Sequence, residues 1–180
     1  APLEKITRLI IVAHPDDESI WAAELLGPTC AVIVVTTDGD SKREKRLGRA
    51  MNTASVSSWR VLNFPQTDYR EKEANWSVGD LQERLVAVMS EYPSVSDVYT
   101  HNSHGEYGHP DHVSVSEAVL EAFKLKYDNA PTVRLHVFAP NSSTEAEHNF
   151  GGDCKESSLR ERLMDIYEDG PQDVKQFRNT

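Results

Sequence analysis

The chain alternates short apolar runs with longer segments whose apolar residues recur every three or four positions. Runs rich in β-branched residues predict five strands: 8–13, 30–36, 60–64, 95–100 and 133–138. The first two are apolar throughout, which indicates cover on both faces, whereas the last alternates and is expected nearer a sheet edge. Helical spacing occupies the segments between and after them: 19–26, 42–57, 81–92, 113–123 and 159–167. This order predicts an α/β fold, a three-layer sandwich around a mainly parallel sheet.

The length and composition are those expected of one domain. With 180 residues, 38% of them hydrophobic and 27% charged, the chain 1–180 can bury a single core, and the tail after about 170 is expected to be mobile. Polar segments at 65–77 and 141–155 are expected to be surface loops. No run approaches the roughly 20 apolar residues of a membrane span, and no export signal is evident.

Charge and cysteine content narrow the function classes further. A formal net charge of -10 argues against an extended nucleic-acid surface, because phosphate contacts need clustered Lys and Arg. Cys30 has the apolar setting of a buried residue, Cys154 lies in a polar segment, and no CxxC spacing occurs. Two free thiols in a reducing compartment are the expectation, so we predict a cytoplasmic protein. The sequence leaves a homo-oligomer open.

Two short motifs carry the candidate chemistry. The run 13–18 reads AHPDDE and the run 109–112 reads HPDH, and each follows a predicted strand. In open α/β sheets, ligands bind outside the carboxyl ends of the strands, so both runs are predicted to share one crevice. Imidazole and carboxylate are ligands that zinc favours. His14, Asp17 and one histidine of the second run would leave a position open for water, with Asp16 beside them as a base and Tyr107 as a hydrogen-bond donor.

Three motifs in this order resemble a known family. They are AHPDDE at 13–18, TDGD at 37–40 and GEYGHPDH at 105–112. Together they resemble the LmbE-like, or PIG-L-like, family of zinc-dependent de-N-acetylases, over about 8–123. The resemblance implies a Rossmann-like fold and the removal of an acetyl group from an N-acetyl amino sugar or its conjugate. The partner it implies is therefore a small-molecule or glycoconjugate substrate.

The same resemblance implies a role for each motif residue. It implies Zn²⁺, with another divalent ion such as Fe²⁺ as the alternative, on three ligands: His14, Asp17 and His112. It also implies residues that act on the substrate: Asp16 as general base, His109 as acid or oxyanion contact oriented by Asp111, and Tyr107 as a mobile donor. His101 and His104 are expected to line the loop rather than to bind metal, and His136 and His148 to be ordinary strand or surface residues.

Substrate-binding candidates lie where the chain departs from the family pattern. Trp21 stands where the family has small residues, so it belongs either to the core or to the substrate pocket. Arg46 corresponds to a family arginine, although Arg49 replaces the acidic residue that usually follows, and Asp68 lies where the family often has a substrate-contacting acid. Two other functions compete: a catalytically silent sugar-binding module of this fold, and a metal-dependent phosphoesterase, which usually needs a second metal or more positive charge. The identity of the N-acetylated substrate stays open.

Overall fold

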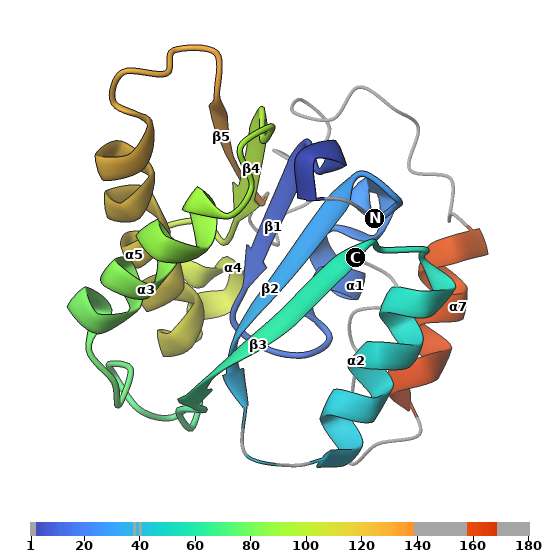
Figure 1. Ribbon diagram of the computed structural model, residues 1–180. Coiled ribbons are helices and arrows are strands. Elements are labelled where there is room, and N and C mark those ends of the chain that lie inside the picture. Colours follow the sequence, from blue (N-terminus) through green and yellow to red (C-terminus); the bar gives the residue numbers. More distant parts are fainter. Residues whose placement is uncertain (1–2, 38, 40, 139–157, 169–180) are drawn as a thin grey trace, which may run out of the picture.

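The structure is a computed structural model that describes residues 3–37, 39, 41–138 and 158–168 (Figure 1). Parallel strands form a five-stranded sheet in the order β3-β2-β1-β4-β5. The strand bounds are β1 (Arg8–Val12), β2 (Cys30–Thr37), β3 (Ser58–Pro65), β4 (Asp97–Thr100) and β5 (Arg134–Val137). All five predicted strands are confirmed, and β5 occupies a sheet edge as its alternating pattern indicated.

Helices cover both faces of the sheet, which confirms the three-layer α/β fold (Figure 1). One face carries α3 (Val78–Ser90) and α5 (Pro110–Tyr127), and the other carries α2 (Ser41–Thr53) and α7 (Ser158–Glu168). Shorter turns are η1 (Leu3–Lys5), α1 (Asp17–Trp21), η2 (Ala23–Leu25) and α4 (Gly105–Gly108). Among the described residues, no helix combines the length and apolar character needed to cross a membrane.

Helix boundaries differ from the sequence prediction for local reasons. The helix expected at 19–26 begins earlier, at Asp17, and divides at Ala22 into α1 and a 3-10 turn. The helix expected at 42–57 ends at Thr53 because Ser55 takes a left-handed φ of 57° and the Val56 N–H bonds the Met51 carbonyl at 2.9 Å. The predicted loop 141–155, the tail after 170, Cys154 and His148 lie outside the described residues.

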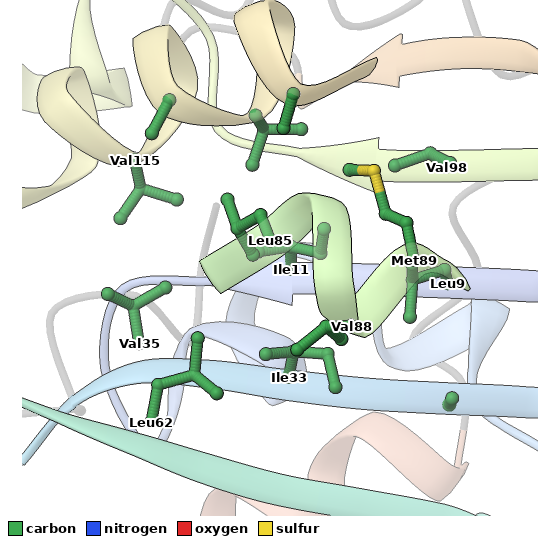
Figure 2. Packing of buried hydrophobic residues seen from close by; sticks show 14 of the residues in the cluster. Leu9, Ile11, Ile33, Val35, Leu62, Leu85, Val88, Met89, Val98 and Val115 are labelled. Atoms are coloured by element: carbon green, nitrogen blue, oxygen red, sulfur yellow. The ribbon is translucent and has the colours of Figure 1, made fainter. Parts of the chain in front are cut away.

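The continuous apolar runs reflect cores on both faces of the sheet. Leu9 and Ile11 of β1 pack in one cluster with residues of α3 and α5, among them Leu85 and Val115 (Figure 2). The alternate residue Ile10 packs in a second cluster with residues of α2 and α7. Because successive strand side chains point to opposite faces, a strand buried on both sides must be apolar at every position.

The strand order fixes where a ligand crevice can form. The chain adds β2 and β3 on one side of β1, then crosses over to add β4 and β5 on the other side. The carboxyl ends of β1 and β4 therefore flank a reversal in strand order, which is the usual ligand position in such sheets. The AHPDDE run follows β1, and the segment that contains the HPDH run follows β4.

Candidate metal centre and active site

The two motifs meet at this reversal, as the sequence predicted. The Nδ1 atom of His14 lies 3.1 Å from Nε2 of His112, and Oδ2 of Asp17 lies 3.3 Å from each of these nitrogens. All three side chains are buried. In a tetrahedral zinc site with bonds of about 2.0–2.1 Å, ligand atoms lie about 3.3–3.4 Å apart. The three atoms are thus spaced like three corners of such a tetrahedron.

Carboxylates behind the two histidines fix which ring nitrogen is free. His14 Nε2 lies 3.0 Å from Asp111 Oδ2, and His112 Nδ1 lies 2.8 Å from Glu106 Oε2. An ionised carboxylate only accepts hydrogen bonds, so these outer nitrogens carry hydrogens, and in each neutral ring the inner nitrogen then presents its lone pair. Two lone pairs and the Asp17 oxygen then face one another at hydrogen-bond distance, an arrangement that a cation between them stabilises. Carboxylates behind ligating histidines are typical of metal sites, and this donor set fits Zn²⁺.

His101 and Glu106 hold this arrangement together from the end of β4. Glu106 Oε2 accepts hydrogen bonds from Nδ1 of His101 at 2.7 Å and from Nδ1 of His112 at 2.8 Å. Burial opposes ionisation of Glu106, but the two histidines lower its pKa to about 2. The Ala13 N–H donates to His101 Nε2 at 2.9 Å. His101 Nε2 is therefore engaged, although it lies 3.4 Å from Asp17 Oδ2. His101 supports the site through its hydrogen bonds with Glu106 and the Ala13 N–H, whereas His104 is exposed.

His109 lies beside the same group and begins helix α5. Its Nδ1 accepts the Asp111 N–H at 3.1 Å, which makes it the N-cap of the helix, with Pro110 following. The neutral ring then carries its hydrogen on Nε2, and burial together with His14 and His112 lowers the His109 pKa to about 4. Ligand atoms of His14, His109 and His112 also lie within 4.8 Å of one another. His109 could therefore take the place of Asp17 as the third ligand. Its Nε2–H makes it a hydrogen-bond donor instead.

Asp16 stands next to Asp17 in a strained backbone conformation. Its φ of 142° and ψ of -30° fall in a region that residues other than glycine avoid, at a cost on the order of 1–3 kcal/mol. Burial and the charge of Asp17 raise the pKa of the Asp16 carboxyl to about 7, even though Arg43 counteracts them. Strain of this kind persists where the surrounding structure holds it, and it is concentrated at active sites.

Residues 9–123 match the family model of GlcNAc-PI de-N-acetylase, PIG-L. The chain belongs to the PIG-L family. Among its relatives, a deacetylase of 1D-myo-inositol 2-acetamido-2-deoxy-alpha-D-glucopyranoside from Kineococcus radiotolerans is 30% identical, with 69% of this chain and 48% of the relative covered. The enzyme of that name from Streptomyces avermitilis is 33% identical, with coverages of 68% and 54%. A protein of Acanthamoeba polyphaga mimivirus is 29% identical, with coverages of 78% and 64%. The chain thus spans between 48% and 64% of the length of these relatives.

Solved structures share the fold of this PIG-L chain. The N,N'-diacetylchitobiose deacetylase of Pyrococcus horikoshii superposes with a TM-score of 0.60 at 15% identity, covering 97% of this chain and 75% of the other. A conserved Thermus thermophilus protein gives a TM-score of 0.55 at 18% identity, with coverages of 76% and 68%. Identities this low show the fold alone, so the function has to be argued from the site.

In this PIG-L chain Arg43 of α2 reaches the site. Arg43 is buried, and its NH2 group lies 3.7 Å from Asp16 Oδ2 and 3.4 Å from the Pro15 carbonyl oxygen. Arg46, three positions on, is half-buried, and its role in substrate binding stays a prediction. The burial of Arg43 could have been inferred from the sequence, because Arg43 lies four and seven positions before the buried Leu47 and Ala50, on the same helix face.

The other two substrate-binding candidates, Trp21 and Asp68, and the predicted hydrogen-bond donor Tyr107 occupy different surroundings. Trp21 is partly buried and packs against the core cluster on the α2 and α7 face. Asp68 is exposed and pairs with Arg70, whose NH2 group lies 2.5 Å from Asp68 Oδ2 and holds the pKa of that carboxyl well below its usual range. Tyr107 is 48% exposed, and its ring centroid lies 5.2 Å from that of His112. Tyr107 thus lies beside the candidate metal ligand His112, and the substrate-binding roles of Trp21 and Asp68 stay predictions.

Asp111 joins the candidate metal centre to the loop after β3. Sequence reasoning paired Asp111 with His109, but only the Asp111 backbone makes that contact, and its carboxylate bonds His14 instead. The same carboxylate accepts the Thr67 N–H at 2.9 Å and the Trp76 Nε1–H at 3.0 Å. The predicted loop 65–77 is therefore fastened near both ends to a residue that orients a candidate metal ligand.

Proposed function

We propose that this protein is a metal-dependent N-deacetylase that hydrolyses the acetamide of an N-acetylglucosamine unit carried on a conjugate. The observation that carries the proposal is the cluster of His14 Nδ1, Asp17 Oδ2 and His112 Nε2, with the outer ring nitrogens bonded to carboxylates and Asp16 alongside. These three residues would hold Zn²⁺. When bound, such an ion supplies Lewis acidity toward the amide carbonyl and toward water at neutral pH.

Asp16 is proposed as the general base of the reaction. Its carboxylate adjoins the ligand Asp17 in the chain and faces Arg43 NH2 at 3.7 Å, so it is oriented without itself belonging to the close ligand cluster. Asp16 takes the proton from the attacking water as the oxygen bonds the acetyl carbon. That proton is then available for the nitrogen when the C–N bond breaks, and the products are acetate and a free amine.

His109 and Tyr107 are proposed to stabilise the negative charge that develops on the carbonyl oxygen. Because His109 Nδ1 accepts the Asp111 N–H, the neutral ring offers Nε2–H as a donor. Tyr107 approaches from the exposed side, where its ring centroid lies 6.0 Å from that of His109. The proposed roles therefore place donors beside the charge and the base beside the water.

The proposed substrate class follows the deacetylases to which the chain is similar. The bacterial relatives act, by name, on a 2-acetamido-2-deoxyglucopyranoside of inositol, and the archaeal structure is a deacetylase of diacetylchitobiose. Both names describe an acetamido sugar joined to a second ring. We therefore propose an N-acetylglucosamine conjugate, with the loop 65–77 as part of the surface that contacts the second ring.

The test compares acetate release by the zinc-loaded protein from N-acetylglucosaminyl-inositol and from diacetylchitobiose. Asp16→Asn is expected to reduce kcat by about 10²–10⁴ while zinc content stays unchanged. Asp128→Asn, an exposed aspartate at the end of α5, is the matched control and should behave like wild type. Full activity of Asp16→Asn would refute the assigned base. Sugar binding without turnover would identify a silent module, and release of phosphate from phosphate esters would favour a phosphoesterase.

A further inference from the structure

Glu18 is a buried carboxylate that the proposed chemistry does not use. Its Oε1 accepts hydrogen bonds from the Ser19 hydroxyl at 2.7 Å and from the Tyr167 hydroxyl at 2.8 Å, and its Oε2 accepts the Asp16 N–H at 3.1 Å. Glu18 is fully buried and Tyr167 nearly so. A buried acid with three donors on it is fixed in place. Within the part of the chain that the structure describes, its only hydrogen-bond partner distant in sequence is Tyr167, which lies 149 residues further along the chain.

Tyr167 belongs to α7, the helix beyond the residues that match the PIG-L family model. Helix α7 packs against α1 and α2, beside the segment that carries the AHPDDE run (Figure 1). Its Leu163 and Met164 are buried in the core cluster on that face, which anchors the helix and sets the position of Tyr167 one turn later. The hydroxyl is therefore held against Glu18 by the packing of the helix.

The hydrogen bond from Asp16 to Glu18 acts where the backbone is strained. Asp16 has a φ of 142°, and its carbonyl oxygen accepts the N–H groups of Ser19 and Ile20 at 2.9 and 3.0 Å. The carbonyl end of Asp16 is thus fixed by the first turn of α1, and its N–H end is fixed by Glu18 Oε2. Holding both ends of the residue keeps the unfavourable φ, which in turn sets the direction of the Asp16 side chain.

We propose that Glu18 and Tyr167 are positioning residues for Asp16, so that α7 completes the active site from outside the part shared with the family model. The Tyr167 hydroxyl fixes the Glu18 carboxylate, which fixes the Asp16 N–H and thereby directs the Asp16 carboxylate. This inference rests on the proposed function for the role of Asp16, but the hydrogen-bonded chain itself is a property of the fold.

The first test uses Tyr167→Phe in the zinc-loaded protein. Loss of the hydroxyl is expected to lower kcat about tenfold, with KM and zinc content within about twofold of wild type. Tyr92→Phe is the matched control, because Tyr92 is also buried and its hydroxyl contacts Ser58 and Arg60 away from the site. If Tyr167→Phe lowers Tm as the control does but leaves kcat unchanged, Tyr167 has a structural role only and the proposal is wrong.

The second test compares two substitutions of Glu18 that differ in whether the new side chain can accept a hydrogen bond from the Asp16 N–H. Glu18→Gln keeps an acceptor for the Asp16 N–H, since its amide group can face the two hydroxyls, whereas Glu18→Met has no comparable acceptor. We expect kcat of the Gln variant to exceed that of the Met variant by about tenfold or more. Equal losses in both variants would overturn the proposal.

A third measurement separates this inference from the proposed function. Amide hydrogen exchange at Asp16 is expected to quicken in Tyr167→Phe and in Glu18→Met, but not in Tyr92→Phe. If the wild-type protein releases no acetate, the proposed function fails, and faster exchange at Asp16 still supports the positioning chain. Unchanged exchange at Asp16 in both variants would overturn the chain, whatever the activity.

Discussion

Replacement of Glu106 by glutamine tests whether the carboxylates behind the histidines set metal affinity. Glu106 accepts from two imidazole N–H groups on one oxygen and from the Asn102 N–H on the other, the last at 2.9 Å. Glutamine has one acceptor oxygen, so in either orientation its NH2 group faces a donor. That mismatch costs about 1–3 kcal/mol in a buried setting. Loss of such a partner typically weakens metal affinity 10–100-fold, which is about 1.4–2.7 kcal/mol of binding free energy.

The assay is a competition for zinc between the protein and a chromogenic chelator at neutral pH. Glu106→Gln is expected to bind zinc at least about tenfold more weakly than wild type, and its metal-free form should unfold at lower denaturant concentration. Glu117→Gln, an exposed residue of α5, is the control and should change neither quantity. A folded Glu106→Gln protein with wild-type zinc affinity would refute the inference that Glu106 selects the ligating nitrogen of His112.

The remaining predictions address metal linkage, backbone and acid stability. Removal of zinc with a chelator should lower Tm and its return should restore it, because a ligand of the folded state alone stabilises that state; an unchanged Tm would contradict a structural contribution of the ion. Gly105→Ala should destabilise by about 1–3 kcal/mol in urea unfolding, since its φ is +65° and a Cβ there would lie 3.0 Å from a Val113 methyl. Gly108→Ala should cost less, because φ is +90° there and, among the described residues, no atom beyond its chain neighbours lies within 4 Å of the added Cβ. Burial opposes ionisation of Asp97, but hydrogen bonds from its neighbours, including His136, lower its pKa to about 2. Its contribution to stability is therefore present above about pH 4 and lost as the pH falls toward 2, so the stability of Asp97→Asn should fall less steeply over that interval in acid titration.

The fold could be predicted because its signals are local. Apolar runs identify strands buried on both faces, and the order of elements leaves few topologies for a parallel sheet. The position of the candidate site also followed from sequence, because both motifs come after strands that turned out to adjoin. Helix ends were less predictable, since they depend on single residues such as Ser55, whose left-handed conformation no propensity indicates.

The supporting residues of the site were harder to identify than its central ones. Arg43 was missed because a charged residue in a basic run reads as solvent-exposed, and only its helix face reveals its burial. Glu106 was missed although its partners lie within six positions of it, because sequence spacing does not show that the segment after β4 turns this carboxylate inward. His101 was missed as a supporting residue because its bond with the Ala13 N–H forms only when β1 and β4 lie side by side, and sequence spacing does not reveal that adjacency. Tyr167 belongs to the same class, at the greatest separation along the chain.

The loop after β3 is held by hydrogen bonds near its two ends, which leaves its middle free to vary in sequence. Thr67 and Trp76 are held by Asp111, and Asn75 bonds Thr67, so the fixed points lie at the ends of the loop. The side chains at 68–73 between them are exposed. Mutations there can alter the surface offered to a substrate without disturbing the carboxylate that orients His14. Asp111 is thus the link between this exposed loop surface and the candidate metal ligand His14.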